Sequence, residues 1–114
     1  MSIAYQTIGD VETVSLDGQL NSSNAAAVET EMLALLAKGA RRVLIDFSRL
    51  DYISSAGLRV VLVVAKRLKQ AGGQLVLSGM QPHIREVFDI SGFLAILDVV
   101  ASREEALARF APAA

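Results

Sequence analysis

The sequence is poor in the residues that most often carry chemistry. Its 114 residues include no cysteine, no tryptophan, one histidine and two prolines. Without cysteine the chain has no disulfide, no thiolate metal ligand and no cysteine nucleophile, which suits a reducing compartment such as the cytoplasm. The single histidine, His83, has no second imidazole and no carboxylate at ligand spacing with which to hold a metal. We therefore expect no metal site, and a solvent-facing helix residue at position 83.

Signals for binding phosphate or nucleic acid are also missing. Eleven Lys and Arg residues against twelve Asp and Glu residues give a net charge of −1, so the basic surface that direct nucleic-acid contact needs is absent. Neither G-x-x-x-x-G-K-[ST] nor G-x-G-x-x-G occurs, and we expect no bound cofactor. A serine nucleophile would have only His83 as its base and lacks the G-x-S-x-G turn, so an enzyme is not expected.

Long apolar runs are absent as well. The longest fully apolar run, Val60 to Ala65, is too short to cross a bilayer. The first residues show neither the basic nor the apolar region of a secretory signal. We expect a cytoplasmic protein that does not insert into a membrane.

What the chain does have is a pattern of short strands alternating with amphipathic helices. Hydrophobic residues make up 53% of the sequence, enough for one well-packed domain over residues 1–110, with a frayed tail at 111–114. Strands are expected at 3–8, 11–16, 42–47, 74–77 and 94–100. Helices are expected from a cap at Ser22, Ser23 or Asn24 to Gly39, and then at 56–70, at 82–90 and from a cap at Ser102 to Phe110. The pattern predicts a single α/β domain with a mixed sheet of about five strands, about four helices and an N-terminal β-hairpin.

Two adjacent serines stand where the expected strand at 42–47 leads, through a short loop, into the helix at 56–70. A helix N-terminus offers unpaired N–H groups and a partial positive charge, which favour a phosphate. Ser54 or Ser55 could therefore be a phosphorylation switch. The plainer alternative is that these serines only cap the helix, because serine is among the commonest capping residues. One serine could also cap the helix while the other faces solvent.

The helix at 56–70 carries apolar residues outside its expected core face, which consists of Leu58, Val61, Leu62, Ala65 and Leu68. Val60 and Val63 are expected on the opposite side. Arg59 and Arg67 flank them, so this side could be a protein-docking patch. The alternative is that other segments of the same domain cover it. Gly57, in the first turn, is expected to permit close approach of the backbone by a neighbouring strand or by a partner.

Six segments of the chain occur in an order that characterises one protein family. They are Val14–Asn21, Val43–Ser48, Tyr52–Leu58, Lys66–Leu68 followed by Gly72-Gly73, Phe88–Phe93 and Ser102–Leu107. Together they resemble the STAS domain family, specifically the bacterial anti-sigma factor antagonists, over nearly the whole chain. In that family the helix opens with Asp-Ser-Ser-Gly-Leu or Asp-Ser-Thr-Gly-Leu, and the first serine is phosphorylated. Matching Gly57 and Leu58 to this motif implies phosphorylation at Ser55, with Ser54 as the second choice.

The resemblance implies a regulatory function by partner switching. The unphosphorylated protein would bind an anti-sigma factor that is also an ATP-binding serine kinase, and would thereby release the sigma factor. Phosphorylation would end this binding, and a PP2C-type serine phosphatase would restore it. We expect the partner-binding surface to contain Asn21, Asp51, Ser54, Ala56, Gly57, Arg59, Val60, Val63 and Arg67.

The chain departs from the family pattern next to the expected phosphorylation site. Ser54 stands where the family has aspartate, and Ala56 replaces the second hydroxyl residue. Asn21 stands where the family often has another aspartate.

Other functions are compatible with the same resemblance, because one fold serves many roles. One alternative is a soluble STAS subunit of a membrane transporter complex of the lipid-transport type, which would not switch by phosphorylation. Another is a sensor that holds a small molecule between the sheet and the helices, although the sequence supplies no phosphate loop for it.

Overall fold

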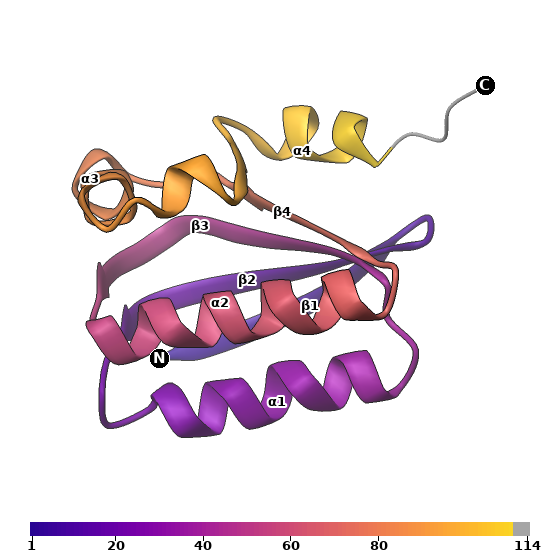
Figure 1. Cartoon of the computed structure of the whole chain (residues 1–114), viewed down its shortest axis with the longest axis horizontal. Coiled ribbons are helices and arrows are strands. Elements are labelled where there is room, and N and C mark those ends of the chain that lie inside the picture. The colour runs from indigo at the N-terminus through magenta and orange to yellow at the C-terminus, as the bar shows by residue number, and fades with distance from the viewer. Residues whose placement is uncertain (111–114) are drawn as a thin grey trace.

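The computed structural model describes residues 1–110, which form five strands and four α-helices (Figure 1). The strands are β1 (Ser2–Ile8), β2 (Val11–Leu20), β3 (Arg42–Ile53), β4 (Gln74–Ser78) and β5 (Asp98–Val100). The α-helices are α1 (Ala25–Ala37), α2 (Ser55–Gln70), α3 (Pro82–Ile90) and α4 (Arg103–Arg109), and a short 3₁₀ helix, η1, spans Phe93–Ala95. The expected frayed tail at 111–114 lies outside the described residues. Over residues 1–110 no helix is long and apolar enough to cross a membrane.

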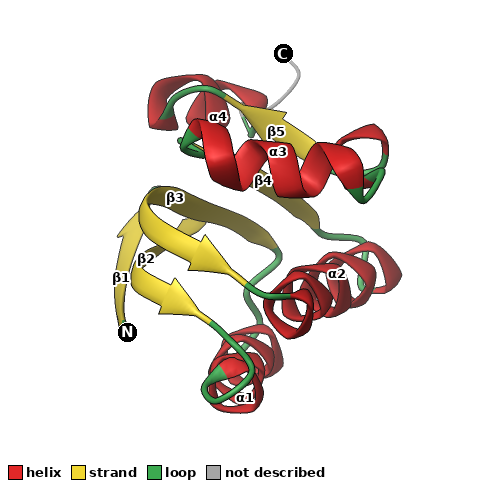
Figure 2. Ribbon diagram, turned by 90° about the vertical axis from the view of Figure 1, so that its left-hand side faces the viewer, coloured by secondary structure: helices red, strands yellow, loops and turns green. Residues whose placement is uncertain are grey.

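The strands form one mixed sheet in the order β1-β2-β3-β4-β5. β1 and β2 pair antiparallel, and the other neighbours pair parallel. Gly9, at φ +62°, has the backbone conformation that a type II′ turn needs at its first central position. Helices α1 and α2 cover one face of the sheet, and α3 and α4 cover the other (Figure 2). The predicted α/β class, mixed sheet and N-terminal hairpin are therefore confirmed.

Two hydrophobic clusters hold these layers together. The larger cluster joins the sheet to α1, α2 and α3, and within it the rings of Phe47 and Phe88 meet edge to face with their centroids 5.8 Å apart. The smaller cluster lies under α4 and consists of Val11, Leu44, Val76, Val100, Ala106 and Phe110. Alternation along the strands sends successive side chains to opposite faces, so both faces of the central strands are buried.

Strand β3 is longer than the sequence predicts, since it continues from Phe47 to Ile53. β4 pairs with β3 only as far as Asp46, but β2 stays paired with β3 to its end through two shifts of register. On the side that β4 leaves free, the Gln81 side-chain amide donates to the carbonyl oxygen of Leu50 at 3.0 Å. Pairing with β2 thus carries the strand to the start of α2, with side-chain support from Gln81 on its other side.

The expected strand at 94–100 is wrong in its first half. Residues Phe93–Ala95 form η1, and only Asp98–Val100 form β5. Gly92, at φ +79°, turns the chain into this short helix, and Phe93, Leu94 and Leu97 pack against the larger cluster. Their spacing fits a helical turn rather than the alternation of a strand.

One of two expected helix N-caps is present. The Ser102 hydroxyl oxygen accepts from the Glu105 N–H at 3.1 Å and caps α4. At the start of α1, the Asn24 side chain makes no capping hydrogen bond.

A partly buried ion pair attaches α4 to the sheet. The Asp46 carboxylate on β3 accepts from the Arg103 guanidinium at 2.9 Å and from the Ser48 N–H at 2.9 Å. Arg103 also donates to the Ser15 hydroxyl at 3.1 Å. Burial raises the pKa of the Asp46 carboxyl, but the hydrogen bonds from Ser48 and Arg103 outweigh that effect, and the pKa lies below its ordinary value of 3.8. The pair therefore stabilises the fold while Asp46 is ionised.

This lowered pKa predicts a pH-dependent contribution to stability. A carboxyl whose pKa is lower in the folded state stabilises it above the unfolded pKa and loses that effect as the pH falls through the folded pKa. At pH 7, Asp46→Asn is expected to lower the free energy of unfolding by about 1–2 kcal/mol. The difference from wild type should shrink as the pH falls below 3.8.

Urea denaturation at a series of pH values measures this difference. Asp17→Asn is the matched control, because Asp17 forms an exposed pair with Arg49 at 3.7 Å and such pairs contribute little. A deficit in Asp46→Asn that stayed constant down to the most acidic pH would contradict the prediction.

Candidate functional site

The start of α2 is fixed to the carboxyl ends of β2 and β3. The Ser54 N–H donates to the Leu20 carbonyl oxygen at 2.9 Å, which joins the end of β2 to the residue that follows β3. Ser54 then caps the helix, because its hydroxyl oxygen accepts from the Gly57 N–H at 3.1 Å. Ser54 is half-buried in this position. The capping hypothesis therefore holds for the first of the two serines.

Ser55 is the first residue of α2 and is exposed to solvent. Within residues 1–110, the N–H groups of Ser55 and Ala56 have no acceptor, as the first N–H groups of a helix generally do not. Arg59 follows one turn later on the same side of the helix and is also exposed. A negative charge on the Ser55 hydroxyl would lie near these donors and at the positive end of the helix dipole. The structure therefore leaves Ser55 exposed while Ser54 caps the helix.

Gly57 is buried where the first turn of α2 meets the two strand ends. A Cβ atom there would lie 2.8 Å from Cγ1 of Ile53, 2.8 Å from Cγ of Leu20 and 3.1 Å from the Leu20 carbonyl oxygen. Of the two sequence-based explanations for this glycine, close packing against neighbouring strands is the one that the structure supports. Gly57 is therefore buried against the strand ends and fixes the position of the first turn that carries the serines.

The loop between β2 and α1 lies beside the serines. Asn21 is half-buried, and its side-chain oxygen accepts from the Ser23 N–H at 3.0 Å and from the Ser23 hydroxyl at 2.6 Å. Asn24 holds the same loop from the other side, because it accepts from the Asn21 N–H at 2.9 Å and donates to the Gln19 carbonyl at 2.8 Å. The asparagine side chains thus fix the loop through neutral hydrogen bonds, without a carboxylate at position 21.

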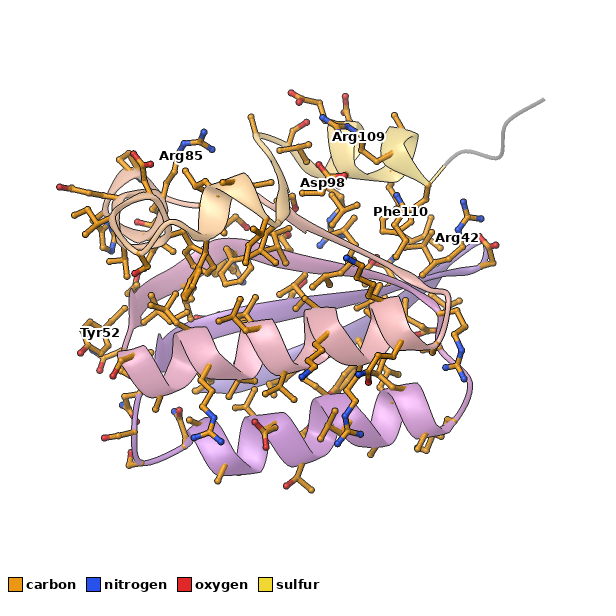
Figure 3. The ribbon with its side chains drawn as sticks, in the orientation of Figure 1. Arg42, Tyr52, Arg85, Asp98, Arg109 and Phe110 are labelled. Carbon is orange, nitrogen blue, oxygen red and sulfur yellow. The ribbon has the colours of Figure 1, made fainter. Side chains whose placement is uncertain are left out.

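The last residues of β3 add exposed groups that the sequence analysis only partly identified. Asp51 is exposed, and its carbonyl oxygen lies 2.5 Å from the His83 ring nitrogen Nε2. His83 is exposed on α3, as expected, but this contact also links α3 to the end of β3. Tyr52 is 49% exposed and lies beside the start of α2 (Figure 3). Sequence analysis missed Tyr52 because its expected strand ended at residue 47, which left no basis for deciding where this side chain points.

The predicted docking patch on α2 is only partly present. Val60 is 4% exposed and belongs to the core, so its expected position on an exposed side is wrong. Helix α1 packs against α2 (Figure 2), and Val60 lies at the groove between these two helices. Val63 is half-buried and Arg67 is exposed, but they lie about 12 and 18 Å along the helix from Ser55. The structure does not bring these two residues together with the serines.

One region at the carboxyl ends of β2 and β3 therefore gathers the remaining candidates other than Asp51, whose carbonyl oxygen contacts His83 on α3. We call it the Ser55 surface, and it consists of Asn21, Tyr52, Ser54, Ser55, Ala56 and Arg59. Beside it a shallow groove of about 320 Å³ runs between α1 and α2 and is lined by Ser22, Ala25, Ala26, Glu29, Ala56, Arg59 and Val60. In the part of the chain that the structure describes, no cluster of three His, Asp or Glu side chains could hold a metal ion. The surface offers a hydroxyl, hydrogen-bond donors and one cation.

Comparison with known proteins assigns the family. The STAS domain model matches residues 2–106, and the chain belongs to the STAS domain family. BtrV of Bordetella bronchiseptica, named as a candidate anti-sigma factor antagonist, is 54% identical over 110 residues, which are 96% of this chain and 95% of that protein. The similarity thus covers nearly the whole length of both proteins.

Solved structures share the fold at lower identity. A candidate anti-sigma factor antagonist from Thermotoga maritima superimposes with a TM-score of 0.91 at 21% identity, covering 94% of this chain and 92% of that one. The Bacillus cell fate determinant SpoIIAA in its phosphorylated form gives a TM-score of 0.75 at 23% identity, covering 96% of this chain and all of that one. The arrangement of one mixed sheet between two pairs of helices is therefore the STAS fold.

Replacing Gly57 tests how tightly α2 is seated on the strands. In a helix, Gly→Ala alone should stabilise by about 0.5–1 kcal/mol. Because the added Cβ would overlap Leu20 and Ile53, Gly57→Ala is expected to destabilise the protein by about 1–3 kcal/mol. Urea denaturation gives the sign of the change in the free energy of unfolding. That sign shows whether the gain in helix propensity or the overlap of the added Cβ is the larger effect. A stabilised variant would show that the strand ends move aside at no cost.

Alanine substitutions at the two serines should separate their structural roles. Ser54→Ala removes the cap and is expected to lower the free energy of unfolding by about 1 kcal/mol. Ser55→Ala removes an exposed hydroxyl and should change it by less than about 0.5 kcal/mol. The pair serves as its own matched control in thermal or urea unfolding. Equal losses in both variants would contradict the assignment of Ser54 as the capping residue.

Proposed function

We propose that this protein is an anti-sigma factor antagonist that acts by partner switching through the Ser55 surface. The unphosphorylated form binds an anti-sigma factor that is also an ATP-binding serine kinase, and the sigma factor is released. Phosphorylation of Ser55 ends this binding, and a PP2C-type serine phosphatase reverses the modification. In this scheme the chain is a ligand and a substrate in the cytoplasm, and nucleotide and Mg²⁺ belong to its partners.

One observation favours Ser55 over Ser54 as the phosphorylated residue. Ser54 is half-buried with its hydroxyl engaged by the Gly57 N–H, whereas Ser55 is exposed at the first position of α2. A kinase needs an accessible hydroxyl, and modifying the cap would also cost the helix its capping bond. The near full-length relationship to BtrV and the existence of a phosphorylated SpoIIAA structure with the same fold support this function.

The geometry supports a switch that does not require unfolding. A phosphate brings roughly −1.5 to −2 charges at neutral pH. In the free protein it would meet the unpaired N–H groups of Ser55 and Ala56 and the positive end of α2. In a closed interface the same charge would have to lose its water or repel acidic groups of the partner. A hundredfold loss of affinity needs only about 2.8 kcal/mol of this penalty.

Tyr52 extends the proposed contact surface beyond the serines. Exposed tyrosines are enriched at protein interfaces because they combine a large apolar ring with a hydroxyl. Tyr52, at 49% exposure beside the start of α2, is the large exposed ring of the Ser55 surface. We therefore place it in the kinase contact together with Ala56 and Arg59, and we assign Gly57 and the buried Val60 to positioning.

The first test compares wild type, Ser55→Ala and Ser55→Asp as baits in lysate of the native host, with bound proteins identified by mass spectrometry. Wild type and Ser55→Ala are expected to retain the same ATP-binding serine kinase, and Ser55→Asp should lose it. The purified kinase with Mg²⁺ and ATP should then add one phosphate to wild type and to Ser54→Ala but none to Ser55→Ala, as intact mass shows.

Controls separate the switch from a folding defect. Ser55→Asp is expected to keep the thermal stability of wild type, and Ile90→Ser alters a 79% exposed side chain far along the chain on α3 and should leave kinase binding unchanged. Tyr52→Ala should weaken binding at least tenfold. Equal retention of the kinase by wild type and Ser55→Asp would refute the proposal, and capture of a transporter component by all baits would favour a transporter subunit instead.

A further inference from the structure

The outer edge of β1 is a long strand edge with none of the usual protection. Within residues 1–110 no strand lies beyond β1 in the sheet (Figure 2). Its seven residues, Ser-Ile-Ala-Tyr-Gln-Thr-Ile, include no charge, no proline and no glycine, and five of the seven are exposed. Natural proteins usually block such edges with lysine, proline, a bulge or a very short strand, because unpaired N–H and C=O groups attract another strand.

The opposite edge of the sheet shows the contrast. β5 has only three residues, and its Asp98 carboxylate accepts from Arg109 at 2.9 Å. Figure 3 shows these two side chains beside each other at α4. A short, charged edge of this kind is poorly suited to pairing with another strand. The two edges of this sheet therefore differ in their capacity for pairing.

The hairpin register determines which backbone groups of β1 point outward. The two-residue turn at Gly9-Asp10 makes Ile8 and Val11 the closing pair, and the ladder continues from there to Ser2 and Asp17 without a shift. Hydrogen-bonded pairs alternate along an antiparallel ladder and begin at the closing pair of such a turn. Residues 2, 4, 6 and 8 thus bond to β2, and Ile3, Tyr5 and Thr7 direct their N–H and C=O groups to the free edge.

We propose that this edge is a self-association site, at which β1 pairs antiparallel with β1 of a second copy. The outward-facing positions 3, 5 and 7 are symmetric about Tyr5, so a twofold axis there places Tyr5 opposite Tyr5 and Ile3 opposite Thr7. Every outward backbone group then has a partner in a single register. The result is a continuous sheet across two copies, with no charged residue in either edge strand.

The side chains around β1 are compatible with this pairing. The Tyr5 hydroxyl donates to the Glu31 carboxylate on α1 at 2.8 Å, which draws the ring over its own helix and away from the strand edge. Burial, together with this hydrogen bond and the carboxylate charge, raises the pKa of Tyr5 to about 12, so the ring stays neutral. The ring in this position does not block the approach of a second strand to the edge.

Self-association at β1 goes beyond the proposed switch and does not depend on it. The Ser55 surface lies at the carboxyl ends of β2 and β3, whereas the proposed contact runs along the side of the sheet. A dimer formed in this way leaves both Ser55 hydroxyls exposed. Failure of either proposal would leave the other intact.

A cysteine cross-linking experiment tests the register directly, because the natural chain has no cysteine. In the proposed pair, residue 3 of one copy faces residue 7 of the other, within the Cα separation of about 4.4–6.8 Å that a disulfide spans. Ile3→Cys and Thr7→Cys, mixed and oxidised with copper phenanthroline, are expected to form a heterodimer. Each variant alone places its two cysteines about 14 Å apart, four residues along the strand, and should stay uncrosslinked.

Sedimentation equilibrium over a hundredfold range of concentration tests association without a cross-link. Wild type is expected to dimerise reversibly, and Thr7→Pro should be monomeric because it removes an outward N–H without breaking a bond to β2. Thr7→Ala is the matched control, since both variants lose the Thr7 hydroxyl bond to Glu12 but only proline loses the N–H. A monomeric wild type, unchanged association of Thr7→Pro, or cross-linking of single variants as fast as the mixture would overturn the proposal.

Discussion

The seating of the first turn of α2 on the ends of β2 and β3 is the constraint on which the site depends. A backbone hydrogen bond from Ser54 to Leu20 joins the two strand ends, and Gly57 lets the helix backbone lie against Leu20 and Ile53. Parallel strands bring their carboxyl ends to the same edge, so the loop that follows β2 comes to lie beside the start of α2. The position of Ser55 therefore follows from sheet topology and one absent side chain.

The two serines divide a structural task and a chemical one. Ser54 caps the helix at the position where the family motif has aspartate, and aspartate and serine are about equally good capping residues. What Ser54 does not preserve is the negative charge. The Ser55 hydroxyl is exposed and takes no part in the cap, and this separation of roles is what the proposed switch at position 55 requires.

Much of the fold could be predicted from the sequence, because period, turn chemistry and capping residues act locally. The hairpin at Gly9, the helix beginning at Pro82 and the cap at Ser102 depend on such local rules. Val60 could not be placed in this way, because α2 packs against both the sheet and α1, and its buried arc is wider than one expected face. The length of β3 likewise depends on Gln81, which lies 28 residues after Ile53 in the chain.

The exposure of Tyr52 shows how one misplaced boundary affects the site. With β3 ending at 47, residues 48–53 were expected to form a loop, and no alternation rule applied to them. As strand residues, Tyr52 and Ile53 point to opposite sides of β3, so the packing of Ile53 against Gly57 turns Tyr52 away from that contact, and Tyr52 is 49% exposed. The same packing that positions Ser55 thus also presents an aromatic ring beside it. An exposed hydroxyl and an exposed ring at one end of the sheet are therefore consequences of a single packing arrangement.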